Sequence, residues 1–421
     1  MTLRAGQLAA LADAIAYVGS LQEPADVMLH HFFRRQPALG QRDRAFIADG
    51  VFALLRRRRS LLRQAETDEP RKLALAVTMR ELGHSLREIE PLLPPAEAAW
   101  ARAFKGRRAQ LSPAEAADLP DWLWQRLGEA YPEDEREAMA RSWLTPAPLD
   151  IRVNPLKAKH ANARADARAT LAADGIMADP TPYSPLGLRI DGRPALQRLP
   201  LFVDGVIEIQ DEGSQLLCYL LAPKRNDMVV DFCAGAGGKT LLLGAMMRSQ
   251  GRLYAFDVST ARLAKLKPRL ARSGLSNVQA MRISDERDAH VKRLAGKIDR
   301  VLVDAPCSGF GTLRRNPHLK WRHGPEAIAE LAVKQARILA SAATLLKPGG
   351  RLVYATCSVL PEESDAIVDA FLAQHPTFAS LDASTELKRA DIALDTGNRL
   401  RLSTHRHGCD GFFAAVLTRT A

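Results

Sequence analysis

The stretch VVDFCAGAGGKT, at Val229–Thr240, decides the fold class of this chain. It combines a short β-rich run, the acidic residue Asp231, a glycine-rich turn and a helix that begins near Lys239. Glycines in such a turn let the strand pass into the helix and let the backbone approach a ligand. A phosphate-binding loop would require G-x-x-x-x-G-K-[ST], but Cys233 stands where the first glycine belongs. The turn therefore predicts a nucleotide-type pocket of another kind.

Similar segments follow one another along the rest of the chain. They are MVVDFCAG, GRLYAFDVS, IDRVLVDAPCSG and GRLVYATCSV, and each is a short apolar run that ends in a polar or glycine-rich turn. Helical segments separate them, so the pattern predicts a doubly wound, mostly parallel α/β sheet. A last strand is expected in GFFAAVLTRT, at Gly411–Thr420.

Acidic residues end the first two of these predicted strands. Asp257 ends the second strand, in YAFDVS, and a carboxylate there can accept both ribose hydroxyls of an adenosine. A glycine turn alone occurs in many α/β proteins, but the two acids together favour S-adenosylmethionine over a dinucleotide. Asp285 can bind the adenine amino group, with Glu286 and Asp288 as alternatives. The predicted donor site comprises Asp231, Cys233, Ala234, Gly235, Ala236, Gly237, Gly238, Lys239, Asp257, Asp285 and Asp304.

The composition indicates a globular chain with an acidic partner. The 421 residues carry a formal charge of +11, which favours nucleic acid or a membrane surface. Five cysteines without close pairing do not resemble a disulfide framework or a zinc ribbon, so no metal site is predicted and a reducing compartment is expected. A secretion signal and a run of 18 apolar residues are both missing from the sequence, so a cytoplasmic location without membrane association is expected.

The chain divides into three regions by sequence pattern. Residues 1–144 show apolar residues at three- and four-residue spacing, which predicts an all-helical domain. Residues 145–222 begin with a proline-rich linker, Thr145–Pro155, and mix the strand-like pieces DIRVN, LGLRI and LFVDGVIEIQ with one helical segment. They predict a small α/β subdomain. Residues 223–421 contain the doubly wound sheet.

Two cysteines stand at the ends of two predicted strands. Cys307 lies in D-A-P-C-S and Cys357 in T-C-S, and each is followed by a serine. A lone cysteine in this position is more often a small buried apolar residue. Because the carboxyl ends of parallel strands meet at one edge of the sheet, two such cysteines indicate two thiols presented to one pocket.

The segments DFCAGAGGKT, DAPCSGFGTLRRNP, KPGG and YATCS resemble the RsmB/Nop/Sun family of S-adenosylmethionine-dependent RNA cytosine-5 methyltransferases. RVNPLK, IQDEGSQL and DGFFAAVL extend the resemblance from about Leu149 to the C-terminus. It implies a Rossmann-like class I methyltransferase sheet and an RNA-binding role for the small subdomain. LGQRDRAFIADGVFALLRRRR is similar to the NusB-like helical RNA-binding domain of bacterial members. Two sites depart from the family pattern: Gly235 and Ala236 replace alanine and proline in the glycine turn, and His318 replaces a common acid.

The resemblance implies a mechanism with two thiols. Attack of a thiolate on cytosine carbon 6 makes carbon 5 nucleophilic toward the methyl group. In this family the T-C cysteine attacks and the P-C cysteine assists release, so Cys357 is the implied nucleophile and Cys307 the release residue. Asp304 is expected to bind the cytosine ring, and Lys239 either lowers a thiol pKa or is a surface lysine. DNA cytosine-5 methyltransferases use the P-C cysteine as nucleophile, which would instead assign the attack to Cys307.

The predicted partner is RNA. A base must be unpaired or flipped out before an enzyme can reach carbons 5 and 6, so basic residues are expected to hold the strand. Ribosomal RNA is the first expectation and transfer RNA the second, with a monomeric protein; a non-catalytic RNA-binding or assembly factor is the alternative. The candidate RNA-binding residues are Arg152, Asn154, Arg314, Arg315, Lys320, Arg56, Arg57 and Arg58.

Overall fold

The computed structural model describes residues 3–157 and 162–420. The chain forms two compact units. Their bounds are Met1–Pro146 with Thr312–Pro325 for the first, and Ala147–Gly311 with Glu326–Ala421 for the second. The sequence had assigned Thr312–Pro325 to the catalytic domain. This segment packs in the helical unit instead, because the Trp321 indole donates to the Leu55 carbonyl at 2.7 Å and joins its apolar core.

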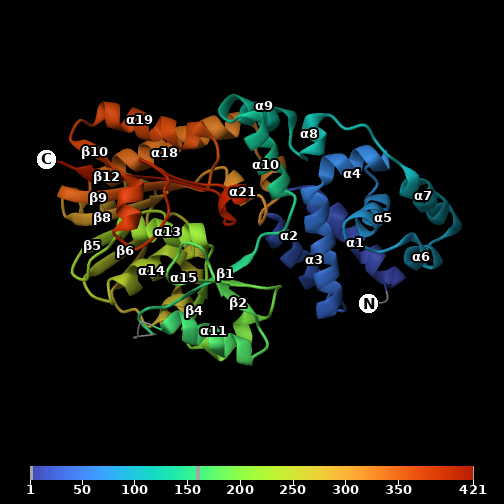
Figure 1. The fold of residues 1–421 in the computed structure, drawn as a ribbon, viewed down its shortest axis with the longest axis horizontal. Coiled ribbons are helices and arrows are strands. Elements are labelled where there is room, and N and C mark those ends of the chain that lie inside the picture. Colours follow the sequence, from blue (N-terminus) through green and yellow to red (C-terminus); the bar gives the residue numbers. More distant parts are fainter. Residues whose placement is uncertain (1–2, 158–161, 421) are drawn as a thin grey trace. The chain divides into compact units, whose positions relative to one another are not determined.

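The described residues of the first unit form helices and loops, as predicted (Figure 1). In α1, Leu8, Leu11, Ile15 and Val18 recur at helical spacing and are buried against the other helices. The helices are α1 (Ala5–Gly19), α2 (Ala25–Arg35), α3 (Gln41–Arg56), α4 (Arg58–Ala65), α5 (Pro70–Arg80), α6 (Leu86–Ile89), α7 (Pro95–Gly106), α8 (Pro113–Ala116), α9 (Asp121–Ala130), α10 (Glu133–Trp143) and α17 (Leu319–Arg322).

The second unit begins with a four-stranded antiparallel sheet of order β2-β3-β1-β4. Helix α11 (Ala163–Ala173) packs on it through Ala167 and Leu171, which confirms the predicted α/β fold of this region. The strand expected in LFVDGVIEIQ, residues 201–210, is wrong in its first half. Pro200 begins a short helix there, α12 (Pro200–Val203). The strands are β1 (Leu149–Val153), β2 (Ala178–Pro180), β3 (Gly187–Ile190) and β4 (Ile207–Ile209), so β1 lies inside the predicted linker.

The large sheet has the order β10-β12-β9-β8-β5-β6-β7, with β11 paired to β12. The central strands β9, β8, β5, β6 and β7 run parallel, and β12 and β10 add an antiparallel edge. The chain winds outward in both directions from the β5–β8 pair, which is therefore the switch point of a doubly wound fold. The strands are β5 (Met228–Asp231), β6 (Arg252–Asp257), β7 (Val278–Arg282), β8 (Ile298–Asp304), β9 (Leu346–Thr356), β10 (Phe378–Leu381), β11 (Leu400–Leu402) and β12 (Phe412–Arg419).

Helices cover both faces of this sheet (Figure 1). Val229 of β5 packs on one side with residues of α13 and α14, whereas Val230 packs on the other with residues of α18 and α19. Burial on both faces explains the continuous apolar runs of the central strands. The flanking helices are α13 (Glu212–Leu221), α14 (Gly238–Met246), α15 (Thr260–Ser273), α16 (Ala289–Lys292), α18 (Pro325–Ala343), α19 (Asp365–Gln374), α20 (Ala383–Lys388) and α21 (Thr404–His407).

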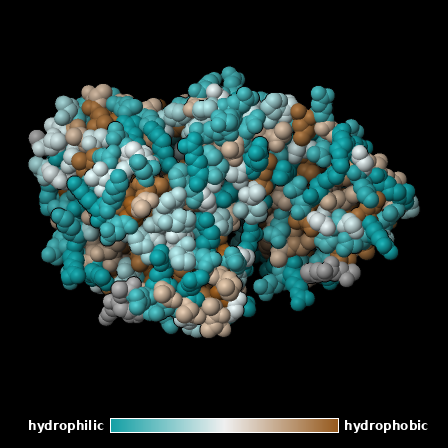
Figure 2. Space-filling model, viewed as in Figure 1, coloured by the Kyte–Doolittle hydropathy of each residue, from teal (hydrophilic) through white to brown (hydrophobic). Residues whose placement is uncertain are grey.

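The face shown in Figure 2 is mainly hydrophilic, with hydrophobic residues in small groups. The large apolar side chains that are exposed, Met177, Val203, Val258 and Val333, lie on separate elements. Single exposed apolar residues of this kind are ordinary on a protein surface. Within the two described ranges, every helix is too short or too polar to cross a membrane.

Candidate active site

The glycine turn after β5 takes a conformation that requires glycine. Gly235 and Gly237 have φ angles of +57° and +84°, in the left-handed region. A Cβ atom on Gly237 would also lie 2.1 Å from Leu266 Cδ1 of α15. The turn therefore brings α14 close to α15, and it begins α14 directly after Gly237.

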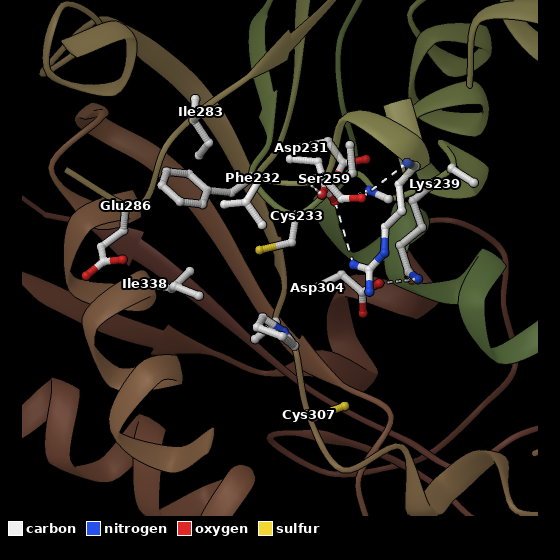
Figure 3. Close-up of a pocket in the computed structure, with 18 of the residues that line it drawn as sticks. Asp231, Phe232, Cys233, Lys239, Ser259, Ile283, Glu286, Asp304, Cys307 and Ile338 are labelled. Atoms are coloured by element: carbon white, nitrogen blue, oxygen red, sulfur yellow. Dashed lines mark hydrogen bonds and ion pairs between the residues drawn. The ribbon is translucent and has the colours of Figure 1, made fainter. Parts of the chain in front are cut away.

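A cavity of about 1010 Å³ lies at the carboxyl ends of the parallel strands, beside the switch point (Figure 3). Glu286, Ile283 and Phe232 lie on one side in the figure, and Lys239 and Asp304 lie on the other. Ten of the eleven predicted donor-site residues line it; Gly237 instead forms the turn behind the loop. The ten are Asp231, Cys233, Ala234, Gly235, Ala236, Gly238, Lys239, Asp257, Asp285 and Asp304.

Asp231 is a buried carboxylate at the base of the cavity, with 1% of its surface exposed. Its Oδ2 accepts a hydrogen bond from the Thr240 hydroxyl at 2.6 Å, whereas Oδ1 has no partner among the described residues. Burial raises the Asp231 pKa to about 7, although the Thr240 bond and the Lys239 charge act in the opposite direction. A buried acceptor without a partner is rare in folded proteins, and a donor group on a ligand would satisfy it.

Asp257 supports the glycine turn as well as lining the cavity. Its Oδ2 accepts from the Gly235 amide at 2.8 Å, and its Oδ1 accepts from the Ser259 amide at 2.7 Å. Each carboxylate oxygen has two acceptor sites, so both oxygens can also accept from a ligand hydroxyl. Asp257 thus has two roles: it holds the glycine turn through the Gly235 amide, and it presents acceptor oxygens to the cavity.

The three acids after β7 have separate environments. Asp285 and Glu286 line the cavity, whereas Asp288 accepts the His290 amide and begins α16. Asp288 also accepts from the Ser284 amide at 2.8 Å, which folds the loop back on itself. The geometry therefore favours Asp285 or Glu286 over Asp288 as a ligand contact.

Cys307 and Cys357 follow the neighbouring parallel strands β8 and β9, and both line the cavity. Their sulfur atoms are 3.3 Å apart, as in a thiol hydrogen bond, and both residues are free cysteines. The hydrogen bond to Cys357 raises the Cys307 pKa well above its ordinary value, with further contributions from burial and from the charges of Cys357 and Glu363. The raised pKa favours the protonated form of Cys307, and either sulfur can be the donor in this contact.

The other three cysteines have raised thiol pKa values. Burial raises the pKa of Cys218 to about 12, and it also raises that of Cys409. Cys233 lines the cavity, where burial, Asp304 and Asp231 raise its thiol pKa. A protonated thiol is a poor nucleophile, so these three cysteines are poorly suited to attack a substrate.

Lys239 and Asp304 form an ion pair inside the cavity, with 2.7 Å between Nζ and Oδ2. The Lys239 side chain is 13% exposed, so the alternative of a surface lysine is wrong. Burial lowers the Lys239 pKa and Asp304 raises it; the balance lies above the ordinary value. Lys239 therefore remains a cation, and the group it contacts directly is Asp304 rather than a thiol.

The structure buries Arg152 and Asn154, two of the predicted RNA contacts. Arg152 donates to Gln210, and burial lowers its pKa to about 10. Asn154 donates to the carbonyls of Gly205 and Ser273 at 3.0 Å, which ties the small sheet to the end of α15. Both side chains hold the second unit together, because their polar atoms are directed to internal acceptors.

Three other predicted RNA contacts, Arg56, Arg314 and Lys320, are buried within the helical unit. Arg56 donates to the Arg314 carbonyl at 3.1 Å, and Lys320 donates to the Arg56 carbonyl at 2.9 Å. These bonds fasten the segment Thr312–Pro325 to the end of α3. The side chains are not accessible to a phosphate in this structure.

Arg57, Arg58 and Arg315 are partly exposed, so RNA contact stays a prediction for them. The arginine run, Arg56–Arg59, does not lie on one continuous helix, because α3 ends at Arg56 and α4 begins at Arg58. Arg57 lies 3.4 Å from Glu81, and the Arg58 guanidinium lies 5.8 Å from the centre of the Trp321 ring. Arg57 and Arg58 therefore have different partners within the helical unit.

The glycines after Cys307 bring two loops into close contact. The Gly311 amide donates to the Cys357 carbonyl at 2.8 Å, and the Gly411 amide donates to the Gly311 carbonyl at 2.8 Å. A Cβ on Gly311 would lie 2.1 Å from the Gly411 carbonyl oxygen. We call the segment around Cys307 the P-C loop and the segment around Cys357 the T-C loop. Gly311 and Gly411 connect these two loops to each other and to the start of β12.

Sequence reasoning missed four basic residues that line the cavity, namely Arg262, Lys265, Lys334 and Arg337. They lie in two pairs, three residues apart, on α15 and α18. A spacing of three places both members of a pair on one helix face, which is the signal that could have identified them. Arg337 also pairs with Glu286, at 3.1 Å.

The comparisons with known proteins agree with this geometry. Residues 218–418 match the family model of the 16S rRNA methyltransferase RsmB/F, and residues 119–197 match the ferredoxin-like domain of RsmF/B-like methyltransferases. A probable ribosomal RNA small subunit methyltransferase B of Synechocystis sp. is 34% identical over 311 residues, which cover 74% of this chain and 69% of the relative. Its probable counterpart in Bacillus subtilis is 34% identical, covering 71% and 66%. The solved structure of PH0851 superposes with a TM-score of 0.79 at 25% identity, covering 99% of both chains.

Proposed function

Because this chain belongs to the RsmB/F family of 16S rRNA methyltransferases, we propose that it transfers a methyl group from S-adenosylmethionine to carbon 5 of a cytosine in small-subunit ribosomal RNA. The family supports the RNA class and the methyl transfer. The choice of cytosine carbon 5 is supported by the two facing thiols, because methylation of that carbon needs a nucleophile on carbon 6 and later its release.

The cavity residues fit S-adenosylmethionine, which supplies an electrophilic methyl group on its sulfonium when bound. That molecule presents an ammonium group and two ribose hydroxyls as donors. Asp231 offers a buried acceptor oxygen without a partner among the described residues, and Asp257 offers further acceptor capacity. Asp285 and Glu286 line the same cavity and can accept from an adenine amino group.

In the first step the Cys357 thiolate forms a bond to cytosine carbon 6. The electrons of the carbon 5–carbon 6 double bond then move toward carbon 5 and the ring amide. Carbon 5 takes the methyl group as the sulfur–methyl bond of the donor breaks, with its electron pair remaining on the sulfur. Asp304, held by Lys239 at 2.7 Å, is positioned to hydrogen-bond the ring as its charge changes. The Lys239 ion pair restricts the orientation of this carboxylate.

Release requires a base that takes the proton from carbon 5. In the free enzyme Cys307 is protonated, because its hydrogen bond to Cys357 and the Cys357 charge raise its pKa. Once the Cys357 sulfur is bonded to carbon 6, its charge no longer raises the Cys307 pKa, whereas burial and Glu363 still do. Release then requires the Cys307 thiol proton to pass to water. The Cys307 thiolate then removes the carbon 5 proton, the double bond re-forms, and the Cys357 thiolate leaves carbon 6.

The contact of 3.3 Å between the two sulfur atoms carries this proposal. The test supplies radiolabelled S-adenosylmethionine with unmodified small-subunit rRNA, transfer RNA and DNA, followed by nucleoside analysis. We expect label in 5-methylcytidine of rRNA. Cys357→Ala should reduce it at least about 10³-fold and prevent a covalent RNA adduct. Cys307→Ala should accumulate an adduct that survives a denaturing gel.

Cys218→Ala is the matched control, because Cys218 is a fully buried cysteine that is not among the residues lining the cavity. It should retain methyl transfer without an adduct. Reversed phenotypes of Cys307→Ala and Cys357→Ala would contradict the assigned roles. Label confined to transfer RNA or DNA would contradict the substrate, and donor binding without transfer to any nucleic acid would indicate a binding protein.

A further inference from the structure

Each catalytic cysteine is followed by a serine, and the two serines meet at one carboxylate. Ser308 and Ser358 are buried, and both hydroxyls donate to Glu363 Oε2 at 2.5 Å. The two hydroxyl oxygens are 3.2 Å apart. Glu363 is fully buried, with 0% of its surface exposed. One carboxylate therefore connects the residue after Cys307 to the residue after Cys357.

The second oxygen of Glu363 fixes the P-C loop further. Its Oε1 accepts from the Ser308 amide at 2.8 Å and from the Gln335 side-chain amide at 3.0 Å. The same Gln335 amide donates to the carbonyl of Pro306, the residue before Cys307, at 2.9 Å. The backbone on both sides of Cys307 is thus bound, directly or through Gln335, to Glu363.

The strand that precedes Cys357, β9, is also hydrogen-bonded to Glu363, through the backbone of Glu363. The Tyr354 hydroxyl of β9 donates to the Glu363 backbone carbonyl at 2.9 Å. The Glu363 segment therefore contacts β9 three residues before Cys357 and contacts the T-C loop one residue after it. Because both cysteine loops are hydrogen-bonded to the same carboxylate, these bonds set the position of one sulfur relative to the other.

We propose that Glu363 is a positioning residue that holds the two cysteine loops at the separation required for methyl transfer and release. The role of the two thiols rests on the proposed function, whereas the positioning of their sulfur atoms does not. A carboxylate that only stabilised the core would affect unfolding without changing how the two thiols react with each other. The two roles therefore predict different results.

Glu363→Gln is the sharpest variant. A glutamine has nearly the same shape, but one of its oxygens is replaced by an amide group that donates. The Ser308 backbone amide and the Gln335 side-chain amide can only donate, so the new amide group must face the two serine hydroxyls. Ser308 and Ser358 then lose the charged acceptor that they share, and hydrogen bonds to a charged group are the stronger ones. The loops should then shift relative to each other, while the donor cavity keeps its residues.

The first measurement uses the free protein and dibromobimane, a short reagent that cross-links two nearby thiols, with the Cys307–Cys357 cross-link identified by peptide mass spectrometry. We expect Glu363→Gln to slow this cross-link by about tenfold or more, since small displacements have large effects on reactions between oriented groups. Cys307→Ser should abolish it. Ser364→Ala is the matched control, because it removes a buried hydroxyl bond to Leu360 in the same turn.

Equal cross-linking rates in wild type and Glu363→Gln would overturn the positioning role, as would an equal slowing in Ser364→Ala. If Glu363→Gln fails to fold, Ser308→Ala and Ser358→Ala decide the question, because each removes one connection and keeps the carboxylate. Each should slow the cross-link, and wild-type rates in both would overturn the proposal.

The second measurement separates turnover from binding. With rRNA, Glu363→Gln should lower kcat about 10- to 100-fold and leave KM for S-adenosylmethionine within about twofold. The fraction of enzyme in covalent adduct should rise, because release depends on both thiols. Unchanged kcat and adduct fraction in an active wild-type background would overturn the proposal. A wild type without RNA methylation would refute the proposed function, and the cross-linking rates would still decide the role of Glu363.

Discussion

Two buried lysines in this protein lie near carboxylates, yet their pKa values move in opposite directions. Lys239 in the candidate active site has a pKa above the ordinary value, although burial lowers it, because Asp304 is in direct contact at 2.7 Å. Lys320 in the helical unit is 1% exposed, and burial lowers its pKa to about 7. Its Nζ donates to a backbone carbonyl, and Asp118 is bonded to Ser60 instead.

The difference teaches that direct pairing, not burial alone, decides the charge of an internal lysine. A nearby opposite charge favours the charged form, and desolvation disfavours it. The Asp304 Oδ2 accepts directly from Lys239, whereas the Asp118 oxygens accept from the Ser60 amide and hydroxyl. The pairing thus favours the charged form of Lys239, whereas burial without a direct ion pair favours the neutral form of Lys320.

Of the effects that follow from this comparison, the largest is expected from the loss of the Lys239–Asp304 pair. Lys239→Met and Asp304→Asn should each reduce kcat for RNA methylation about 100-fold, because the carboxylate loses its orientation or its charge. Lys347→Met is the matched control, since Lys347 and Asp299 form an ion pair of 2.9 Å at the opposite ends of β8 and β9. Steady-state kinetics would contradict the assigned role if Lys239→Met resembled Lys347→Met.

A smaller effect should appear in the stability of the helical unit. Between pH 7 and the ordinary lysine pKa of 10.5, unfolded Lys320 binds a proton that the folded form has lost. The stability of the folded state therefore rises with pH across this window, by at most about 1.4 kcal/mol per pH unit. Lys320→Met should remove this contribution. Calorimetry from pH 7 to 9 would test it, and parallel stability profiles of the two proteins would contradict the lowered pKa.

The smallest effect concerns the arginine run. Arg57→Ala and Arg58→Ala should weaken RNA binding a few-fold each and reduce the salt slope of the affinity by about one per lost phosphate contact. Arg56→Ala should lower the melting temperature instead, because its buried side chain donates to the Arg314 carbonyl. Binding titrations at several salt concentrations separate the two classes. Unchanged RNA affinity in Arg57→Ala and Arg58→Ala would remove both residues from the RNA interface.

Local sequence patterns anticipated much of the catalytic unit. The β-rich runs correspond to β5, β6, β8, β9 and β12, because a strand buried on both faces requires a continuous apolar run. Motifs at strand ends also placed Cys307 and Cys357 at one pocket, because parallel strands bring their carboxyl ends together. The sequence did not identify Glu363, whose partners Ser308 and Gln335 are distant along the chain.

By itself, the sequence determined the doubly wound fold, the glycine turn and the two thiols, since each depends on neighbouring residues and on the alternation of strands and helices. Only the tertiary structure decided which charges are available. Arg56, Arg152 and Lys320 have the residue type of an RNA contact, but their surroundings bury them and supply internal acceptors. Burial and pairing depend on residues far apart in the chain, and a local pattern of basic residues contains no information about them.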